Sequence, residues 1–515
     1  MDAAPAHHPD PEDLASAADA PPAFSHEQIL KVVTGILLCL LLAAIDQTVV
    51  VPAVPSIAAD LNGFSHLSWI VTAYLLTSTV ATPIYGKLSD IYGRRALLLP
   101  AIVLFVAASM LCGFAENLFE LIVARALQGL GGAGLMAMSQ ASIADVVSPR
   151  ERGRYQGYMA GTWGVASVAG PILGGWMTDS LSWRWIFWIN LPIGIAAYVL
   201  SSSALKLLTI KVRKVKIDYV GAAILSGCIT TSLLVLSWGG TEYAWDSPEI
   251  IGLGVASVAL LAALVWQERR NAEPLLPPRL FGNGVFSRGV VLSALNSGGM
   301  FGAIFLLPLY FQLIGGADAS LSGTLIVPFL GANCIGAFTA GQLARRMGRV
   351  KIILVTGLGS AAAGFCMLAT IGPASSSILT VLYMLVIGGG IGVCMPTALV
   401  TVQNAAERRD VGAATGAFLF LRSMGGAVGS TLAGVMLAAQ FARHVAASGV
   451  TVPIDMGSLR VHEGSSVVLD AATRLVAQGA LSSAFHVAFV ACAVLEVGAL
   501  LACWGMRDVP LRSTS

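Results

Sequence analysis

The sequence GKLSDIYGRR at residues 86–95 joins two long apolar stretches, and it recurs in altered form as GQLARRMGR at residues 341–349. The first copy aligns with the second at a constant offset, which pairs Gly86 with Gly341 and Arg94 with Arg349. A further set of glycines, at residues 157, 170 and 175, aligns in the same way with residues 416, 429 and 434. The chain therefore consists of two halves built on one plan.

The composition of the chain is that of a membrane protein. Hydrophobic residues make up 56% of the 515 residues, charged residues 11%, and the mean hydropathy is +0.78. Soluble globular proteins are far more polar. Because a helical span needs about 20 apolar residues, we expect an all-α polytopic membrane protein with fourteen spans, near residues 30–51, 67–86, 96–115, 119–142, 155–178, 185–207, 217–238, 249–267, 287–313, 321–343, 351–371, 378–400, 412–440 and 485–506.

The basic residues predict how these spans are oriented. With fourteen spans, most of the 30 Lys and Arg residues fall on the side of the two termini, and the opposite side keeps only Arg184, Arg443, Arg460 and Arg474. The positive-inside rule then places both termini in the cytoplasm. The net charge of +2 averages this sorted distribution and indicates no nucleic-acid partner. The eight cysteines lie in or beside apolar stretches without the spacing of metal ligands, so we expect no metal site.

The predicted organisation has five parts. A disordered cytoplasmic tail, residues 1–29, precedes a six-helix half, residues 30–207. A two-helix insert with a cytoplasmic linker, residues 208–286, leads to a second six-helix half, residues 287–507, which contains an outward loop at 441–484. Residues 508–515 form a short cytoplasmic tail. Duplicated halves are typical of transporters, whose binding site lies at the interface of the repeats near the middle of the bilayer.

Five motifs occur in order along this framework. They are DQTVV at residues 46–50 with Pro52 and Pro55, the stretch at 86–95, RALQG at 125–129, the glycine-rich stretch at 164–175, and WRWIFWINLP at 183–192. On these motifs, residues 30–507 resemble the major facilitator superfamily, and specifically its fourteen-span drug:proton antiporter branch. The resemblance implies two six-helix halves plus two inserted helices in the inner or plasma membrane.

The resemblance also implies proton-coupled export of lipophilic drugs or related molecules, with cationic or zwitterionic compounds favoured. In that family the motif of the fifth span, represented here by Gly164, Gly170, Pro171, Gly174 and Gly175, is associated with exporters that exchange substrate for protons. Glycines at such spacing let helices approach closely in a bilayer, and a proline bends the helix that contains it. An outer-membrane efflux partner reached through an adaptor is a further expectation. We expect no enzyme activity and no cofactor.

The duplicated stretch at 86–95 predicts a gating latch formed by Gly86, Asp90, Gly93 and Arg94. Asp90 and Arg94 are four residues apart, so they share a helical side and can pair with a neighbouring helix end or its dipole. Such a contact forms in one state of an alternating-access transporter and breaks in the other. In the second copy the acidic position holds Arg345, so no equivalent latch is expected there.

Few ionisable residues lie within the predicted spans, and each needs an explanation because a charge at the centre of a span costs on the order of 3 kcal/mol. Asp46 is the main candidate for a proton site, since a carboxylate in a low-dielectric cavity can exchange protons near neutral pH. The alternative is a structural ion pair with Arg125 or Arg422. Arg125 is a candidate for the proton relay. Glu496 is a second proton-site candidate, with a neutral buried role as its alternative.

The remaining candidates concern the substrate. Trp163, Asn296, Phe301, Tyr310 and Arg422 are candidates for lining a cavity for lipophilic ligands. The stretch GLGGAG at 129–134 matches a dinucleotide-binding pattern but lies inside an apolar helix, so it predicts helix packing. Two alternatives to export remain open. One is a proton symporter that imports a nutrient or siderophore, and the other is a non-transporting membrane sensor or enzyme.

Overall fold

The computed structural model describes residues 25–61, 69–147, 149–207, 218–240, 242–271, 273–317, 319–372, 375–447 and 471–508. This part of the chain is helical apart from connections and one isolated bridge between Gly239 and Tyr243. The all-helical fold is therefore as predicted. The expected tail at 1–29, the linker, and the loop at 441–484 lie partly outside the described residues, as does nearly all of 508–515.

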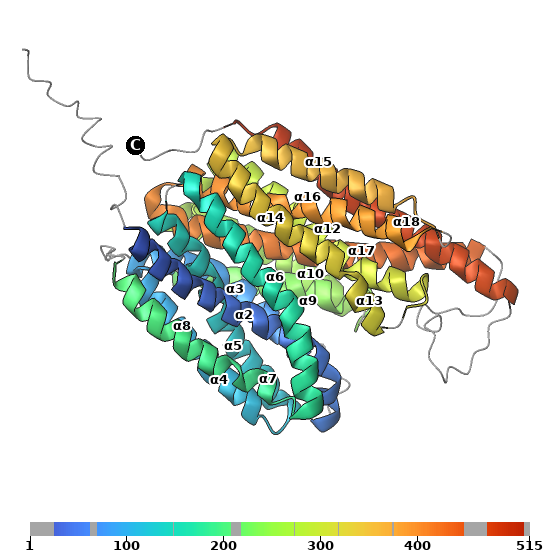
Figure 1. Cartoon of the computed structure of the whole chain (residues 1–515), viewed down its shortest axis with the longest axis horizontal. Helices are drawn as coiled ribbons and strands as arrows, with labels where there is room; N and C mark the ends of the chain where they lie inside the picture. The colour runs from blue at the N-terminus through green and yellow to red at the C-terminus, as the bar shows by residue number, and fades with distance from the viewer. Residues whose placement is uncertain are drawn as a thin grey trace, which may run out of the picture.

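The first half of the chain forms seven α-helices and a short 3-10 turn (Figure 1). They are α2 (His26–Asp60), α3 (Trp69–Tyr92), α4 (Arg94–Phe114), α5 (Leu118–Val146), α6 (Pro149–Ser180), α7 (Trp185–Trp188), α8 (Asn190–Ala204) and η2 (Leu205–Leu207). Local signals mark several helix ends. Ser25 forms a capping box with Gln28 at the start of α2, and Asn117 caps α5. Residues 26–29 of the expected tail are therefore helical.

The insert and the second half complete the chain. The insert consists of α9 (Tyr219–Trp238) and α10 (Pro248–Arg270). The second half consists of α11 (Pro278–Gly282), α12 (Gly284–Leu313), α13 (Ala319–Leu325), α14 (Val327–Met347), α15 (Lys351–Leu368), α16 (Ser377–Ala405), η3 (Arg408–Asp410), α17 (Val411–Ala447) and α18 (Ala471–Trp504). Because α17 runs to Ala447 and α18 begins at Ala471, helix replaces both ends of the loop expected at 441–484.

Among the described residues, twelve helices are long and apolar enough to cross a membrane. They include both helices of the insert. The two remaining long helices, α3 and α6, are absent from this set although each has at least 24 residues. Helix α3 packs against α5 and α17, and α6 packs against α2 and α14. The glycine, polar and charged residues in these two helices lower their mean hydropathy.

The two halves meet at one end of the molecule and diverge toward the other (Figure 1). Two crossings join them, α3 with α17 and α6 with α14. At the first, a methyl group on Gly86 would lie 2.5 Å from the carbonyl oxygen of Gly412. At the second, Gly341 packs on Gly153 just as closely. The duplicated glycines therefore have the same task in both halves, because only a residue without a side chain lets the two backbones approach this far.

The insert covers the crossing of α3 and α17. Leu225 and Ile229 of α9 belong to one apolar cluster with Val80 of α3 and with Phe420 and Met424 of α17. Lys87 in the last part of α3 donates to Glu273, which follows α10, at 2.9 Å. The insert is thus packed against both halves at once.

Candidate functional site

The site centres on Asp46, near the middle of α2, which is fully buried. Its Oδ2 accepts a hydrogen bond from Nη1 of Arg125 at 2.7 Å. Its Oδ1 accepts from Nε2 of Gln128 at 2.7 Å and from Nδ2 of Asn190 at 2.9 Å. The Asp46 carboxylate in α2 is therefore held by donors from two other helices, α5 and α8. All three partners donate hydrogen bonds to its oxygens, which favours the charged carboxylate.

Arg125 is equally well surrounded. Besides Asp46, its guanidinium donates to Oε1 of Gln128 at 2.8 Å and to the carbonyl oxygen of Ile70 at 3.2 Å. Its Cζ also lies 4.5 Å from the centre of the Tyr74 ring. Between the two possibilities left open by the sequence, Asp46 pairs here with Arg125 and not with Arg422. Such a buried pair is costly to break on one side only, because the remaining charge then lacks a partner.

The glycines of the fifth-span motif place α6 directly against this part of α2. A methyl group on Gly170 would collide with the side chain of Thr48, and one on Gly174 would collide with the carbonyl oxygen of Val49. Thr48 also donates to the carbonyl oxygen of Ala166 at 2.9 Å. Two residues after the buried carboxylate, α2 is thus locked to α6 by close packing and a hydrogen bond.

The rest of the motif has other surroundings. Pro171 lies inside α6 and is exposed. Gly175 has no atom within 4 Å of the position a methyl group would take. Gly164 faces the other half, where such a group would meet Sγ of Cys334 on α14 at 2.5 Å. Helix α6 therefore contacts its own half beside Asp46 and the other half nearer the crossing at Gly153.

The residues predicted to form a latch lie at the α3–α17 crossing, and we call this end of the molecule the latch end. Asp90 pairs with Nη1 of Arg94 at 2.8 Å. The two oxygens of Asp90 also accept from the backbone N–H groups of Gly412 at 2.8 Å and Ala413 at 2.7 Å. These groups are unpaired donors at the beginning of α17, so a carboxylate of the first half caps a helix of the second. Gly93, with a φ of +90°, makes the turn between α3 and α4.

Arg94 ties the latch to the rest of the first half. Its Nε donates to Oδ2 of Asp145 at the end of α5 at 2.7 Å, and it also contacts Ser89. Asp145 and Asn190 were not predicted as site residues. Asn190 lies within the quoted WINLP stretch, but an uncharged amide gives no sign of which carboxylate it serves.

Glu496 lies in the second half and is fully buried. Its two oxygens have no hydrogen-bond partner among the described residues, and Oε1 packs against Gly299 of α12. A charged carboxylate without any hydrogen-bond donor is very costly in such a place.

The five cavity candidates are not gathered in one place. Tyr310 is 5% exposed and stacks edge-on with Phe485 at 5.4 Å, inside the core of the second half. Trp163 packs against the core clusters of the first half. Phe301 remains 39% exposed beside Gly426. Asn296 and Arg422 are treated below. We accordingly leave Tyr310 out of the proposed substrate site.

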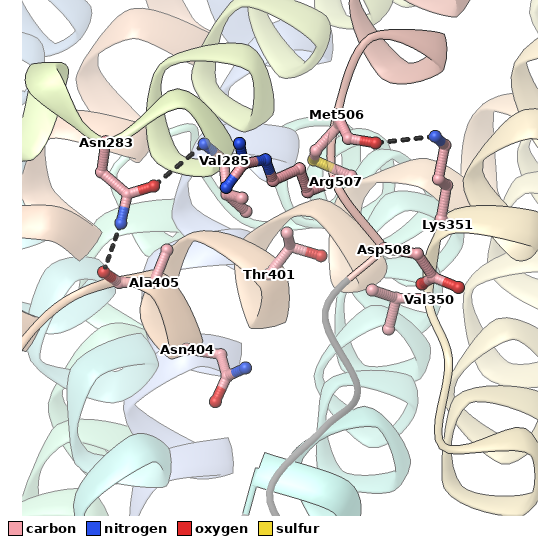
Figure 2. Close-up of a pocket in the computed structure, with 10 residues that line it drawn as sticks. All are labelled: Asn283, Val285, Val350, Lys351, Thr401, Asn404, Ala405, Met506, Arg507 and Asp508. Carbon is pink, nitrogen blue, oxygen red and sulfur yellow. Dashed lines mark hydrogen bonds between the residues drawn. The ribbon is translucent and has the colours of Figure 1, made fainter.

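A hollow at the surface lies away from all these residues, at the latch end of the second half (Figure 2). Its Lys351 donates to the carbonyl oxygens of Trp504 at 2.8 Å and Met506 at 2.7 Å, and Asn283 donates to that of Ala405 at 3.2 Å. These bonds satisfy the last carbonyls of α18 and α16. The hollow is therefore a place where helix ends are anchored.

Comparison with known families identifies this architecture. The model of the Major Facilitator Superfamily matches residues 36–216 and 219–430. The chain belongs to the major facilitator superfamily. As a member, it is a multi-pass membrane transporter, and its role is transport and not catalysis.

Relatives within the family include a protein named as an efflux pump, FUS6 of Gibberella moniliformis, which is 36% identical over 400 residues that cover 76% of this chain and 71% of FUS6. The multidrug transporter protein MdtP of Bacillus subtilis is 38% identical over 408 residues, which cover 79% of this chain and 75% of MdtP. An uncharacterised MFS-type transporter of Mycobacterium tuberculosis is 37% identical over 482 residues, 93% of this chain and 69% of the relative. Among solved structures, the proton:xylose symporter XylE superposes with a TM-score of 0.62 at 15% identity, covering 94% of this chain and 97% of XylE. That last likeness shows the fold alone.

Proposed function

We propose that this protein is a proton-coupled antiporter that exports lipophilic small molecules across the cell membrane by alternating access. The observation that carries the proposal is the buried Asp46–Arg125 pair and its direct packing, through Thr48, against the glycine motif of α6. The proposal needs no outer-membrane partner or adaptor. The name of a relative, the efflux pump FUS6, supports export as the direction of transport.

We further propose fourteen membrane crossings, which adds α3 and α6 to the twelve apolar helices. Their 24 and 32 residues extend about 36 and 48 Å at a rise of 1.5 Å per residue. Both lengths exceed the roughly 30 Å of a bilayer core. With fourteen crossings the positive-inside rule keeps both termini and the latch end in the cytoplasm.

In this orientation the structure corresponds to an outward-facing state. The latch between Asp90 and α17 is closed on the cytoplasmic side, and the two halves diverge toward the outside (Figure 1). An exporter releases its substrate from this state and takes up the proton that drives the next cycle. In the inward-facing state the latch bonds must be broken.

Proton binding at Asp46 supplies the switch. Arg125, Gln128 and Asn190 all donate to the carboxylate, so an added proton displaces at least one of them and removes the negative charge. Arg125 is then a buried cation without its counter-charge, which is unfavourable by several kcal/mol. The strain is relieved by a rearrangement of α2 against its neighbours.

The rearrangement reaches the other half through α6. Thr48 and the packing of Gly170 and Gly174 make α6 follow α2, and the same helix contacts α14 through Gly153 and Gly164. A displacement at Asp46 therefore changes the contact between the halves. Glu496 is a second candidate proton site, because it is already protonated and enclosed in this state and can release its proton only after α12 and α18 separate.

The test uses proteoliposomes with an imposed pH gradient and a lipophilic fluorescent dye. In the Asp46→Asn variant we expect proton-driven dye accumulation to be abolished while dye binding persists, because the substitution removes titration but keeps a hydrogen-bonding side chain. The matched control is Asp60→Asn, which changes a carboxylate at the end of the same helix, 14 residues from Asp46. Undiminished accumulation in Asp46→Asn at equal protein content would disprove the assignment.

The same assay separates export from the symport alternative. An antiporter in everted vesicles takes up dye as protons leave the vesicle, whereas a symporter takes up dye and protons together. A separate pH-sensitive dye, trapped inside the vesicles, reports the direction in which the protons move. Movement of substrate and protons in the same direction would favour import of a nutrient or siderophore.

A further inference from the structure

The second half contains an arginine, Arg422, that has no carboxylate partner among the described residues. Arg422 lies in α17, and its one described polar contact is a weak one, from Nη2 to Sδ of Met300 at 3.8 Å. No salt bridge involves it among the described residues. An arginine in the membrane that has no internal partner marks a route for water, ions or substrate.

The helix face that carries Arg422 looks toward the first half. Thr415 and Leu419 precede Arg422 by seven and three residues, so all three lie along one side of α17. Thr415 accepts from Nε2 of Gln403 at 3.1 Å, and that same group donates to the carbonyl oxygen of Gln140 on α5 of the first half at 3.3 Å. Leu419 packs against an apolar cluster of the first half.

Arg422 thus lies beyond the contacts that close the latch end. It is about 10 Å further along α17 than Thr415, at a rise of 1.5 Å per residue. Thr415 is fully buried, whereas Arg422 is partly exposed. The guanidinium is therefore located at the base of the region where the halves begin to diverge.

The surroundings of Arg422 are apolar with one unsatisfied amide. Met300 provides the sulfur contact, and Phe301 beside it is 39% exposed. Asn296, one turn before Met300 on the same side of α12, is buried, and its Oδ1 has no partner among the described residues. A cation, an amide and apolar side chains together fit a molecule with one acidic group on a lipophilic body.

The other acidic groups within the membrane do not serve Arg422 in this state. Asp46 is already bonded to Arg125. Glu496 is fully buried without an ion pair and packs against Gly299, which is next to Met300 in the chain but points from a different side of α12. No acidic side chain of the described part of the chain therefore forms an ion pair with Arg422 in this state.

We propose that Arg422 binds the carboxylate of the exported molecule, so that the preferred substrates are amphiphilic carboxylic acids, either simple anions or zwitterions. This inference rests on the proposed export function and names its substrate class. The sequence favoured cationic or zwitterionic compounds, and the proposal keeps the zwitterions but replaces the simple cations by anions. A guanidinium matches a carboxylate with two parallel hydrogen bonds, which gives selectivity for the acid over its neutral amide.

Equilibrium binding without any gradient tests the substrate class separately from proton coupling. The probes are a dansyl-labelled eleven-carbon carboxylic acid and its primary amide, and binding to the purified protein in detergent is followed by dansyl fluorescence. Hydrogen bonds to a charged group contribute about 1.5–3 kcal/mol, so we expect the acid to bind about 10- to 150-fold more tightly than the amide. Equal affinities in the parent protein would overturn the proposal.

Variants assign the selectivity to this residue. The Arg422→Met variant should bind the acid and the amide with equal affinity. The Arg422→Lys variant should keep part of the preference for the acid, because lysine retains the positive charge but cannot form the two parallel hydrogen bonds of a guanidinium. The matched control is Arg409→Met, an exposed arginine outside the spans. Thermal unfolding and gel filtration of each variant establish that it is folded.

A different role for Arg422 would give a different pattern. If the arginine pairs with Glu496 in another conformation, Arg422→Met and Glu496→Gln should both weaken acid and amide transport equally, and the acid preference should survive in each. That result overturns the proposal. If acid-selective binding is present but Asp46→Asn still transports normally, the substrate class stands and the proton mechanism fails.

Discussion

The latch at Asp90 gives the most quantitative prediction. Replacing this residue by Ala removes two hydrogen bonds from the beginning of α17 and the ion pair with Arg94. Hydrogen bonds to charged groups contribute about 1.5–3 kcal/mol each, but Arg94 keeps Asp145 as a partner. We also expect water to fill the space that the carboxylate leaves and to bond the freed N–H groups. We therefore expect the latch to lose about 2–3 kcal/mol, which shifts the population toward the open latch about 30- to 150-fold.

Distances between spin labels across the latch end measure this shift. Tyr92 at the end of α3 and Met347 at the end of α14 are exposed and belong to different halves, so they are suitable label positions. Cys366 is exposed and Cys334 is partly so, and both are first replaced by Ser. We expect a second, longer distance in Asp90→Ala that is minor in the parent.

Two further variants complete the test. Asp90→Asn should give an intermediate distribution, since Asn caps helices about as well as Asp but carries no charge for Arg94. Glu27→Ala removes an exposed ion pair within one half and should leave the distances unchanged. If Asp90→Ala also leaves them unchanged, the cap on α17 does not hold the halves together, and the assignment of the latch is refuted.

Three other outcomes are expected. Gly170→Leu should stop transport because its side chain collides with α2, whereas Gly175→Ala, in open space, should transport like the parent, as dye export measures. Bonds from Trp183 and Arg184 hold the pKa of Asp60 below its usual range, so this carboxylate stabilises the fold above about pH 4 and loses that effect as the pH falls through its lowered pKa. Thermal unfolding of Trp183→Phe should show a deficit of about 1 kcal/mol or less at pH 7 that narrows in acid. Exchange of one proton for one monoanion moves two charges, each worth about 2.3 kcal/mol per 100 mV, so a potassium ionophore should slow export of the acid at constant pH gradient; insensitivity would rule out this exchange.

Much of the fold and part of the site follow from the sequence. Apolar length and the repeated glycines predict helices and two halves, because these depend on local composition. Asp90 was predicted to meet a helix end, but only the packing of the halves identifies α17 as that helix. The partner of Asp46 is 79 residues away, and charge alone did not choose between Arg125 and Arg422.

Other features lay beyond the reach of sequence patterns. Tyr310 was predicted to line a substrate cavity, whereas the structure packs it in the core of the second half. The sequence does not indicate which neighbours an aromatic residue in an apolar helix contacts. The loop at 441–484 was drawn too long, since its ends continue the helices on either side. The isolation of Arg422 is a statement about its surroundings in three dimensions, which no local pattern encodes.

The insert makes the two crossings between the halves different from each other. Helices α9 and α10 cover the crossing of α3 with α17, where Leu225 and Ile229 lie against residues of both halves. The equivalent crossing of α6 with α14 has no such cover among the described helices. We therefore expect the lipid to contact the α6–α14 crossing directly, whereas the insert separates the lipid from the α3–α17 crossing.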